Sequence, residues 1–219
     1  PMSEGRLYQV DMRLRPSGNQ GPIASSWNHF KDYQRNEAWI WEHLALTRAR
    51  VITGDSDLAA KFEEFRISLI GNGDKKNTIS AITKLRARIA NVKLKKQVLD
   101  PKFVGGGSLD IELLAQFGRL VMGGEDRGVI MGLKSCLEKK IINGEQFKSL
   151  SEAHHLFWSM RIACKLLGKS LDDELEFGVA AEKFLIRLTG KRSLQEIKIK
   201  LKMTTQNVAD IMNTVLNKS

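Results

Sequence analysis

The sequence predicts a mainly α-helical protein, in which a helical bundle follows a single β-strand. Beyond residue 25, apolar side chains recur at helical spacing, as in the run Leu58, Phe62, Phe65 and Leu69. Only residues 6–15 show the alternation of a strand. Short polar loops separate the helical segments, which is typical of antiparallel neighbours in a bundle.

The strand is predicted by strict alternation from Tyr8 onward. Its apolar face carries Tyr8, Val10, Met12 and Leu14, and its polar face carries Gln9, Asp11, Arg13 and Arg15. The turn-forming run PSGNQGP, residues 16–22, ends it. A lone strand cannot bury its apolar face, and position 1 is not methionine, so we expect the rest of the sheet in a longer protein.

Helices are expected wherever the apolar spacing and the capping residues agree. Ser25 or Ser26 can cap the first helix, Asp55 lies at the start of the third, and glycines at 71 and 73 stop that helix. The predicted helices cover approximately residues 26–33, 37–50, 55–70, 78–92, 108–121, 129–140, 144–167, 171–189, 193–202 and 204–217.

The charge balance favours anionic partners but does not choose among them. Lys and Arg number 35 against 25 acidic residues, a formal net charge of +10. The basic residues are spread over many helices, and the densest run, residues 93–96, is typical of a solvated helix end. No zinc-finger, helix-turn-helix or RNA-recognition signature accompanies them. We therefore predict no nucleic-acid partner.

Other features of the composition indicate a cytoplasmic protein. No apolar run approaches the roughly 20 residues of a membrane span. The two cysteines, Cys136 and Cys164, lie in helical patterns without a CxxC partner, as expected of reduced, buried thiols. His154 and His155 are neighbours on a helix and project in different directions, so we do not expect them to share a metal.

The polar face of the strand is the strongest candidate for chemistry. Asp11, Arg13 and Arg15 follow one another at two-residue steps, about 7 Å apart. A carboxylate beside two guanidinium groups suits a site for Mg²⁺ and a polyphosphate, because the carboxylate binds the cation and the arginines bind phosphate oxygens. The alternative is a solvated sheet face whose charges pair with one another.

Three separated blocks of sequence resemble the glutamine-synthetase adenylyltransferases of bacteria. The first is YQVDMRLRPSGNQGP at residues 8–22, and the second is YQRNEAWIWEH at 33–43 with ALTRAR at 45–50. The third comprises Lys102, the glycines at 105–107, DIE at 110–112 and Gln116. These blocks lie in the first half of the chain. The residue pattern of the second block is similar to that of the C-terminal, adenylylating half of these enzymes.

The resemblance implies a function. One half of such an enzyme transfers AMP from ATP to a tyrosine of glutamine synthetase, which regulates nitrogen assimilation, and the other half removes it. The expected partners are glutamine synthetase, the PII signal protein and ATP. Residues 1–24 would be the end of a polymerase-β-like nucleotidyltransferase domain, and residues 25–219 a helical bundle domain.

The resemblance also implies roles for single residues. In this family three carboxylates hold two Mg²⁺ ions, and Asp11 matches the third, as a catalytic metal ligand. Arg13, Arg15 and Lys102 are the expected nucleotide-binding residues. Asp110 and Glu112 would line the catalytic cleft, or they simply complement the N-terminal dipole of their helix.

One departure from the family pattern limits these expectations. The Gly-Ser-x-x-Asp-x-Asp element that supplies the other two carboxylates is absent from this sequence, and Asp55 or Ser56 is expected to cap a helix instead. We therefore expect this chain to be inactive by itself. Two other interpretations remain: a helical interaction module, and a part of a related PII uridylyltransferase.

Overall fold

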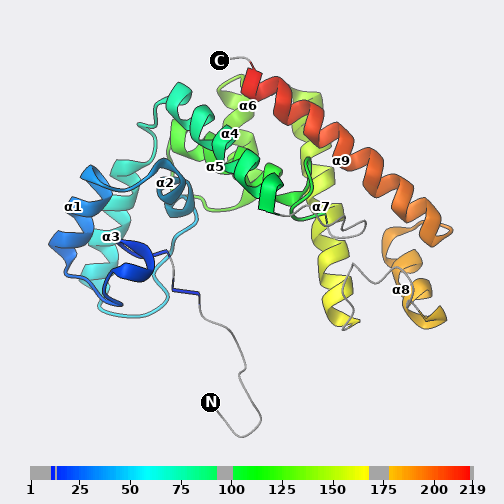
Figure 1. Cartoon of the computed structure of the whole chain (residues 1–219), viewed down its shortest axis with the longest axis horizontal. Coiled ribbons are helices and arrows are strands. Elements are labelled where there is room, and N and C mark those ends of the chain that lie inside the picture. Colours follow the sequence, from blue (N-terminus) through cyan, green and yellow to red (C-terminus); the bar gives the residue numbers. More distant parts are fainter. Residues whose placement is uncertain (1–10, 13, 93–100, 168–177, 218–219) are drawn as a thin grey trace, which may run out of the picture.

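The computed structural model describes residues 11–12, 14–92, 101–167 and 178–217. Over these residues the protein is mainly α-helical, with nine α-helices, one short 3-10 helix and no strand (Figure 1), which confirms the predicted fold class. The elements are η1 (Gly18–Gln20), α1 (Trp27–Asn36), α2 (Ile40–Leu46), α3 (Ser56–Leu69), α4 (Lys75–Val92), α5 (Ser108–Met122), α6 (Val129–Glu138), α7 (Gly144–Leu166), α8 (Val179–Thr189) and α9 (Leu194–Asn217).

The predicted strand is not seen. Residues 6–10 and 13 lie outside the described residues, Asp11 and Met12 have no regular structure, and Leu14 already begins a bend. The Arg15 side chain organises the turn that follows, because its guanidinium donates hydrogen bonds to backbone carbonyls on both sides. A strand needs hydrogen-bonding neighbours, and the described part of the chain offers none.

Several predicted helix boundaries are confirmed by their caps. The Ser26 hydroxyl accepts the N–H of His29, and the Asp55 carboxylate accepts that of Leu58 at 2.8 Å. The helix predicted from residue 78 begins three residues earlier, because Asp74 accepts the N–H groups of the first turn.

The largest errors in predicted helix extent concern α2 and α9. The helix expected over residues 37–50 is the shorter α2. It begins after Trp39, whose backbone N–H donates to the Glu42 carboxylate at 2.8 Å. The two helices expected at 193–202 and 204–217 form one continuous α9. No glycine or proline interrupts this segment, and a single buried stripe runs along it, consisting of Ile197, Leu201, Val208, Ile211, Met212 and Val215.

Helix α5 is the centre of the helical bundle, a name used here for α4–α9. It contacts α2, α4, α6, α7 and α9 and is buried along most of its length. Its closest neighbour is α6, and glycines at the crossing allow the approach. A Cβ on Gly118 would lie 2.5 Å from the Cys136 sulfur, and one on Gly132 would lie 2.4 Å from the Ala115 carbonyl oxygen.

Helices α1–α3 form the N-terminal lobe, residues 27–69. Aromatic side chains join α1 to α3: Trp27 meets Phe65 edge-on at 5.6 Å between ring centroids, and Phe30 lies 5.9 Å from Phe62. Helix α2 extends toward the bundle and buries Leu44 in the bundle core. Among the helices of the described residues, none is long and apolar enough to cross a membrane.

Candidate functional site

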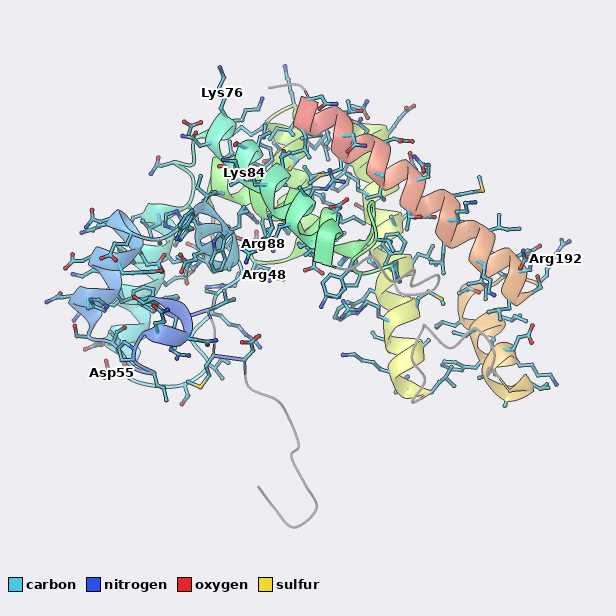
Figure 2. All side chains as sticks on the ribbon, in the orientation of Figure 1. Arg48, Asp55, Lys76, Lys84, Arg88 and Arg192 are labelled. Carbon is cyan, nitrogen blue, oxygen red and sulfur yellow. The ribbon has the colours of Figure 1, made fainter. Side chains whose placement is uncertain are left out.

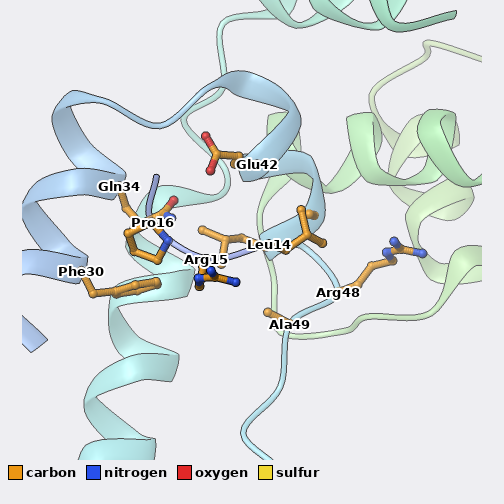
Figure 3. Close-up of a pocket in the computed structure, with 10 residues that line it drawn as sticks. Leu14, Arg15, Pro16, Phe30, Gln34, Glu42, Arg48 and Ala49 are labelled. Atoms are coloured by element: carbon orange, nitrogen blue, oxygen red, sulfur yellow. The ribbon is translucent and has the colours of Figure 1, made fainter. Parts of the chain in front are cut away.

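A pocket of about 380 Å³ lies where the turn at residues 14–16 meets α1 and α2 (Figure 3). It brings two of the three sequence blocks together, because the turn belongs to the first block and α2 to the second. Its walls are formed by Leu14, Arg15, Pro16, Phe30, Gln34, Glu42, Ala45, Leu46, Arg48 and Ala49.

The inner wall of this pocket is a buried polar cluster. The Tyr33 hydroxyl donates to the Glu42 carboxylate at 3.0 Å, and the same carboxylate accepts the N–H of Trp39. Burial, together with the neighbouring Glu42 charge, raises the pKa of Tyr33 above its ordinary value of 10.0. The side-chain oxygen of Gln34 is buried here and has no hydrogen-bond partner in the described residues.

Asp11 and Arg15 are the two candidate residues of the predicted strand that lie in the described part of the chain. Asp11 is exposed, outside any helix, just before the turn. Arg13 lies outside the described residues. Arg15 is half-buried and lines the pocket, but its guanidinium donates to the carbonyls of Met12 at 2.6 Å and Gly21 at 3.2 Å. In this conformation Arg15 therefore supports the turn, and its predicted nucleotide contact stays a prediction.

Asp110 forms a buried structural contact at the start of α5. Its two oxygens accept hydrogen bonds from Arg86 of α4, each at 2.8 Å, and one of them also accepts the N–H of Gly106. This bidentate ion pair joins α4, α5 and the glycine loop.

Glu112 and Lys102 contact residues outside the ion pair of Asp110 and Arg86. Glu112 pairs with Arg48 at 3.1 Å, which links α5 to the end of α2. The Lys102 ammonium lies 4.7 Å from the centroid of the Phe103 ring. Asp110 and Glu112 thus face different helices, and their predicted role in lining a catalytic cleft stays a prediction.

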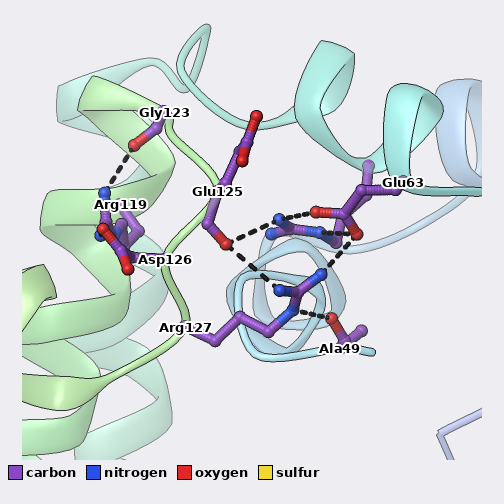
Figure 4. A network of polar contacts seen from close by, with 8 residues as sticks. Ala49, Glu63, Arg119, Gly123, Glu125, Asp126 and Arg127 are labelled. Carbon is purple, nitrogen blue, oxygen red and sulfur yellow. Dashed lines mark hydrogen bonds and ion pairs between the residues drawn. The ribbon is translucent and has the colours of Figure 1, made fainter. Parts of the chain in front are cut away.

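A second polar network was missed by sequence reasoning (Figure 4). Glu63 of α3 pairs with the buried Arg66 and with Arg127, both at 2.5 Å, and Arg127 also donates to the Ala49 carbonyl at 2.7 Å. Arg66 and Arg127 hold the pKa of Glu63 below its ordinary 4.5. The spacing of Glu63 and Arg66 indicates a helical pair, but no local signal predicts Arg127, which is 64 residues away.

These residues do not complete a magnesium site. Within the described ranges, no three His, Cys, Asp or Glu side chains converge so that they could hold a metal ion. Of the carboxylates near the pocket, Glu42 is already engaged by Tyr33 and Trp39. Asp11 is a single carboxylate, and the three-carboxylate site implied by the family resemblance would need two others.

Two family models match different parts of the chain. The model described as glutamate-ammonia ligase adenylyltransferase matches residues 1–65, and the model described as GlnD PII-uridylyltransferase matches residues 82–216. The boundary between them falls near the start of α4.

Curated relatives align across this boundary. The bifunctional glutamine synthetase adenylyltransferase/adenylyl-removing enzyme of Bartonella quintana is 31% identical over 98% of this chain, and that of Bartonella henselae is 33% identical over 98%. The enzyme of the same name from Rhizobium meliloti is 47% identical over 55% of the chain.

The alignments that cover 98% of the chain show which family the whole chain belongs to. The segment that resembles a uridylyltransferase also occurs in proteins named as adenylyltransferases, joined to the same N-terminal segment. The chain spans 22% of the length of the two Bartonella relatives. It belongs to the glutamine-synthetase adenylyltransferase family.

Proposed function

We propose that this chain is part of an enzyme that transfers AMP from ATP to a tyrosine of glutamine synthetase. The observation that carries the proposal is the alignment of 98% of the chain with relatives named for adenylyl transfer to glutamine synthetase. The block at residues 39–50, with Trp39, Trp41 and Arg48, resembles the adenylylating half and supports this direction of the reaction.

In this proposal Asp11 supplies one of the carboxylates that bind Mg²⁺, and the helices position it. When bound, the metal would activate the tyrosine oxygen and stabilise the departing pyrophosphate. The other carboxylates would come from a part of the enzyme that this chain does not contain. ATP and glutamine synthetase would be the substrates, PII a regulatory partner, and the cytoplasm the compartment.

The test uses the chain alone and a chimera. In the chimera, the chain replaces the aligned segment of the Bartonella quintana relative, and both proteins are incubated with glutamine synthetase, Mg²⁺ and ATP labelled in the α-phosphate. We expect label on glutamine synthetase with the chimera and none with the chain alone.

Asp11→Asn in the chimera should lower the rate at least about a hundredfold, as expected for a metal ligand. Asp55→Asn is the matched control, because Asp55 only caps α3. Transfer by the chain alone, or an active Asp11→Asn chimera, would refute the roles assigned here.

A second candidate, a PII uridylyltransferase, is favoured by the family model that matches residues 82–216. The same chimera incubated with labelled UTP and PII separates the two activities. Label on PII but not on glutamine synthetase would replace the first proposal with the second.

A further inference from the structure

A groove between α2 and α4 lies apart from the pocket at the turn. It has a volume of about 390 Å³, and its walls come from the first turn of α2 and the outer face of α4. The α2 wall carries Trp39 and Trp41, whose side chains are 70% and 41% exposed. Two exposed tryptophans that line one groove are unusual, because interfaces rather than free surfaces are enriched in tryptophan.

The opposite wall is basic. Lys84 and Arg88 lie one helical turn apart on α4, both exposed, and neither has an ion-pair partner in the described residues. Figure 2 shows both side chains, with Lys76 further along the same helix. Helix α4 contains no acidic residue, and none of the described acidic side chains lines the groove. The charge of this wall is therefore not neutralised by its surroundings.

The dimensions of the groove favour a short peptide. Its lining positions on α4 run from Asn77 to Arg88, a length of about 16 Å at 1.5 Å per residue, which is about three helical turns. Ala81 and Leu85 provide an apolar floor between the tryptophans and the cations. A partner helix would complement both walls if it carried apolar side chains on one stripe and two carboxylates, one turn apart, beside that stripe.

We propose that this groove docks an acidic, amphipathic peptide segment of another protein, with an apolar side chain between Trp39 and Trp41 and carboxylates at Lys84 and Arg88. A nucleic acid fits less well, because its binding relies on many phosphate contacts and this groove offers two cations beside a mainly apolar lining. The proposal concerns binding only and holds whether or not the chain takes part in AMP transfer.

The test measures binding of a fluorescein-labelled, 16-residue helical probe peptide by anisotropy. The probe carries Glu at two positions four residues apart and Leu and Phe on the adjacent stripe. We expect the double variant Lys84→Glu and Arg88→Glu to weaken binding at least about tenfold, because two attractions become repulsions. Trp39→Ala should weaken it by a similar factor, about tenfold.

The matched control is the double variant Lys183→Glu and Arg187→Glu on α8. These residues have the same types, the same four-residue spacing and the same exposure, beside the exposed Phe184. The control should change affinity less than about twofold, as the attraction between distant exposed charges is screened. Circular dichroism checks that every variant is folded.

Four outcomes would overturn the proposal. The first is that the probe does not bind, and the second is that the two charge-reversal variants lose affinity equally. The third is that a single-stranded oligonucleotide binds more tightly than the probe, with the same dependence on Lys84 and Arg88. The fourth is that the chain self-associates and Trp39→Ala abolishes the self-association.

Discussion

The helical bundle and the N-terminal lobe are stabilised in different ways. The bundle has one continuous apolar core, in which Phe157, Met160 and Leu133 are fully buried. The lobe is stabilised by an aromatic contact between α1 and α3, and by an ion network centred on Glu63. Both regions leave some large apolar side chains exposed, such as Ile52 at 86% in the lobe and Leu166 at 74% in the bundle.

This difference shows what each region needs. Burial of apolar area is the main stabilising term in folding, and the bundle obtains it from its own helices. The lobe depends more on directional polar contacts, such as those that Glu63 makes with Arg66 and Arg127. We therefore expect the bundle to be the more stable region, and the predictions below test this contrast.

The largest effect is expected in the bundle core. Phe157→Ala removes a fully buried ring of α7 and should lower the free energy of unfolding by about 3–5 kcal/mol. Trp158→Ala, at the next position, removes a ring that is 53% exposed and should cost less than about 1 kcal/mol. Urea denaturation measures both, and equal costs would contradict the assigned core.

A smaller, local effect is expected in the lobe. Phe65→Ala breaks the contact between α1 and α3 and should cost about 2–3 kcal/mol, because the half-buried neighbours can partly close the gap. Amide hydrogen exchange should accelerate in α1 and α3 while α5 keeps its protection. Uniform acceleration in both regions would show that lobe and bundle unfold as one unit.

Glu63 should make the lobe sensitive to acid. Its pKa is lower in the folded than in the unfolded state, because Arg66 and Arg127 stabilise the carboxylate. The stabilisation is complete above the unfolded value of 4.5 and is lost as the pH falls through the folded value.

Glu63→Gln should therefore lose about 1 kcal/mol or less at pH 7, since the pair is partly exposed. The variant and wild type should become equally stable at low pH. A constant difference at every pH measured by denaturation would exclude this cause.

The smallest effect concerns His154 in the bundle, where burial rather than pairing shifts the titration. Desolvation and the nearby His155 charge lower the pKa of His154 below 6.5. The folded state therefore binds fewer protons than the unfolded state, and stability decreases as the pH falls from 6.5 through the lowered value. NMR titration should show His154 titrating below 6.5, and titration at or above 6.5 would contradict its burial.

The sequence predicted the fold class and most helices, because apolar spacing and capping are local properties. Ser25 or Ser26 and Asp55 or Ser56 were predicted as caps from their positions alone, and the structure selects Ser26 and Asp55. The break predicted near residue 203 was wrong, since a threonine pair is a weak stop signal and the buried stripe of α9 continues through it. The predicted strand is not seen, and residues 6–10 and 13 lie outside the described part of the chain.

The candidate site was predicted only in part. The first two sequence blocks meet in one pocket, where the turn at Arg15 lies against α2, and the roles assigned to their residues stay predictions. The sequence alone could not predict that Asp110 pairs with Arg86 or Glu112 with Arg48, because these partners are distant along the chain.

The sequence by itself determined the family, the helical class and the position of Asp11 within a recognisable motif, because these depend on residue types at fixed spacing. Only the tertiary structure decided which charges are engaged and which are available. Arg86 is engaged by Asp110, whereas Lys84 and Arg88 on the same helix face a groove without a carboxylate. That distinction follows from packing, which orients one face of α4 toward α5 and leaves the other open.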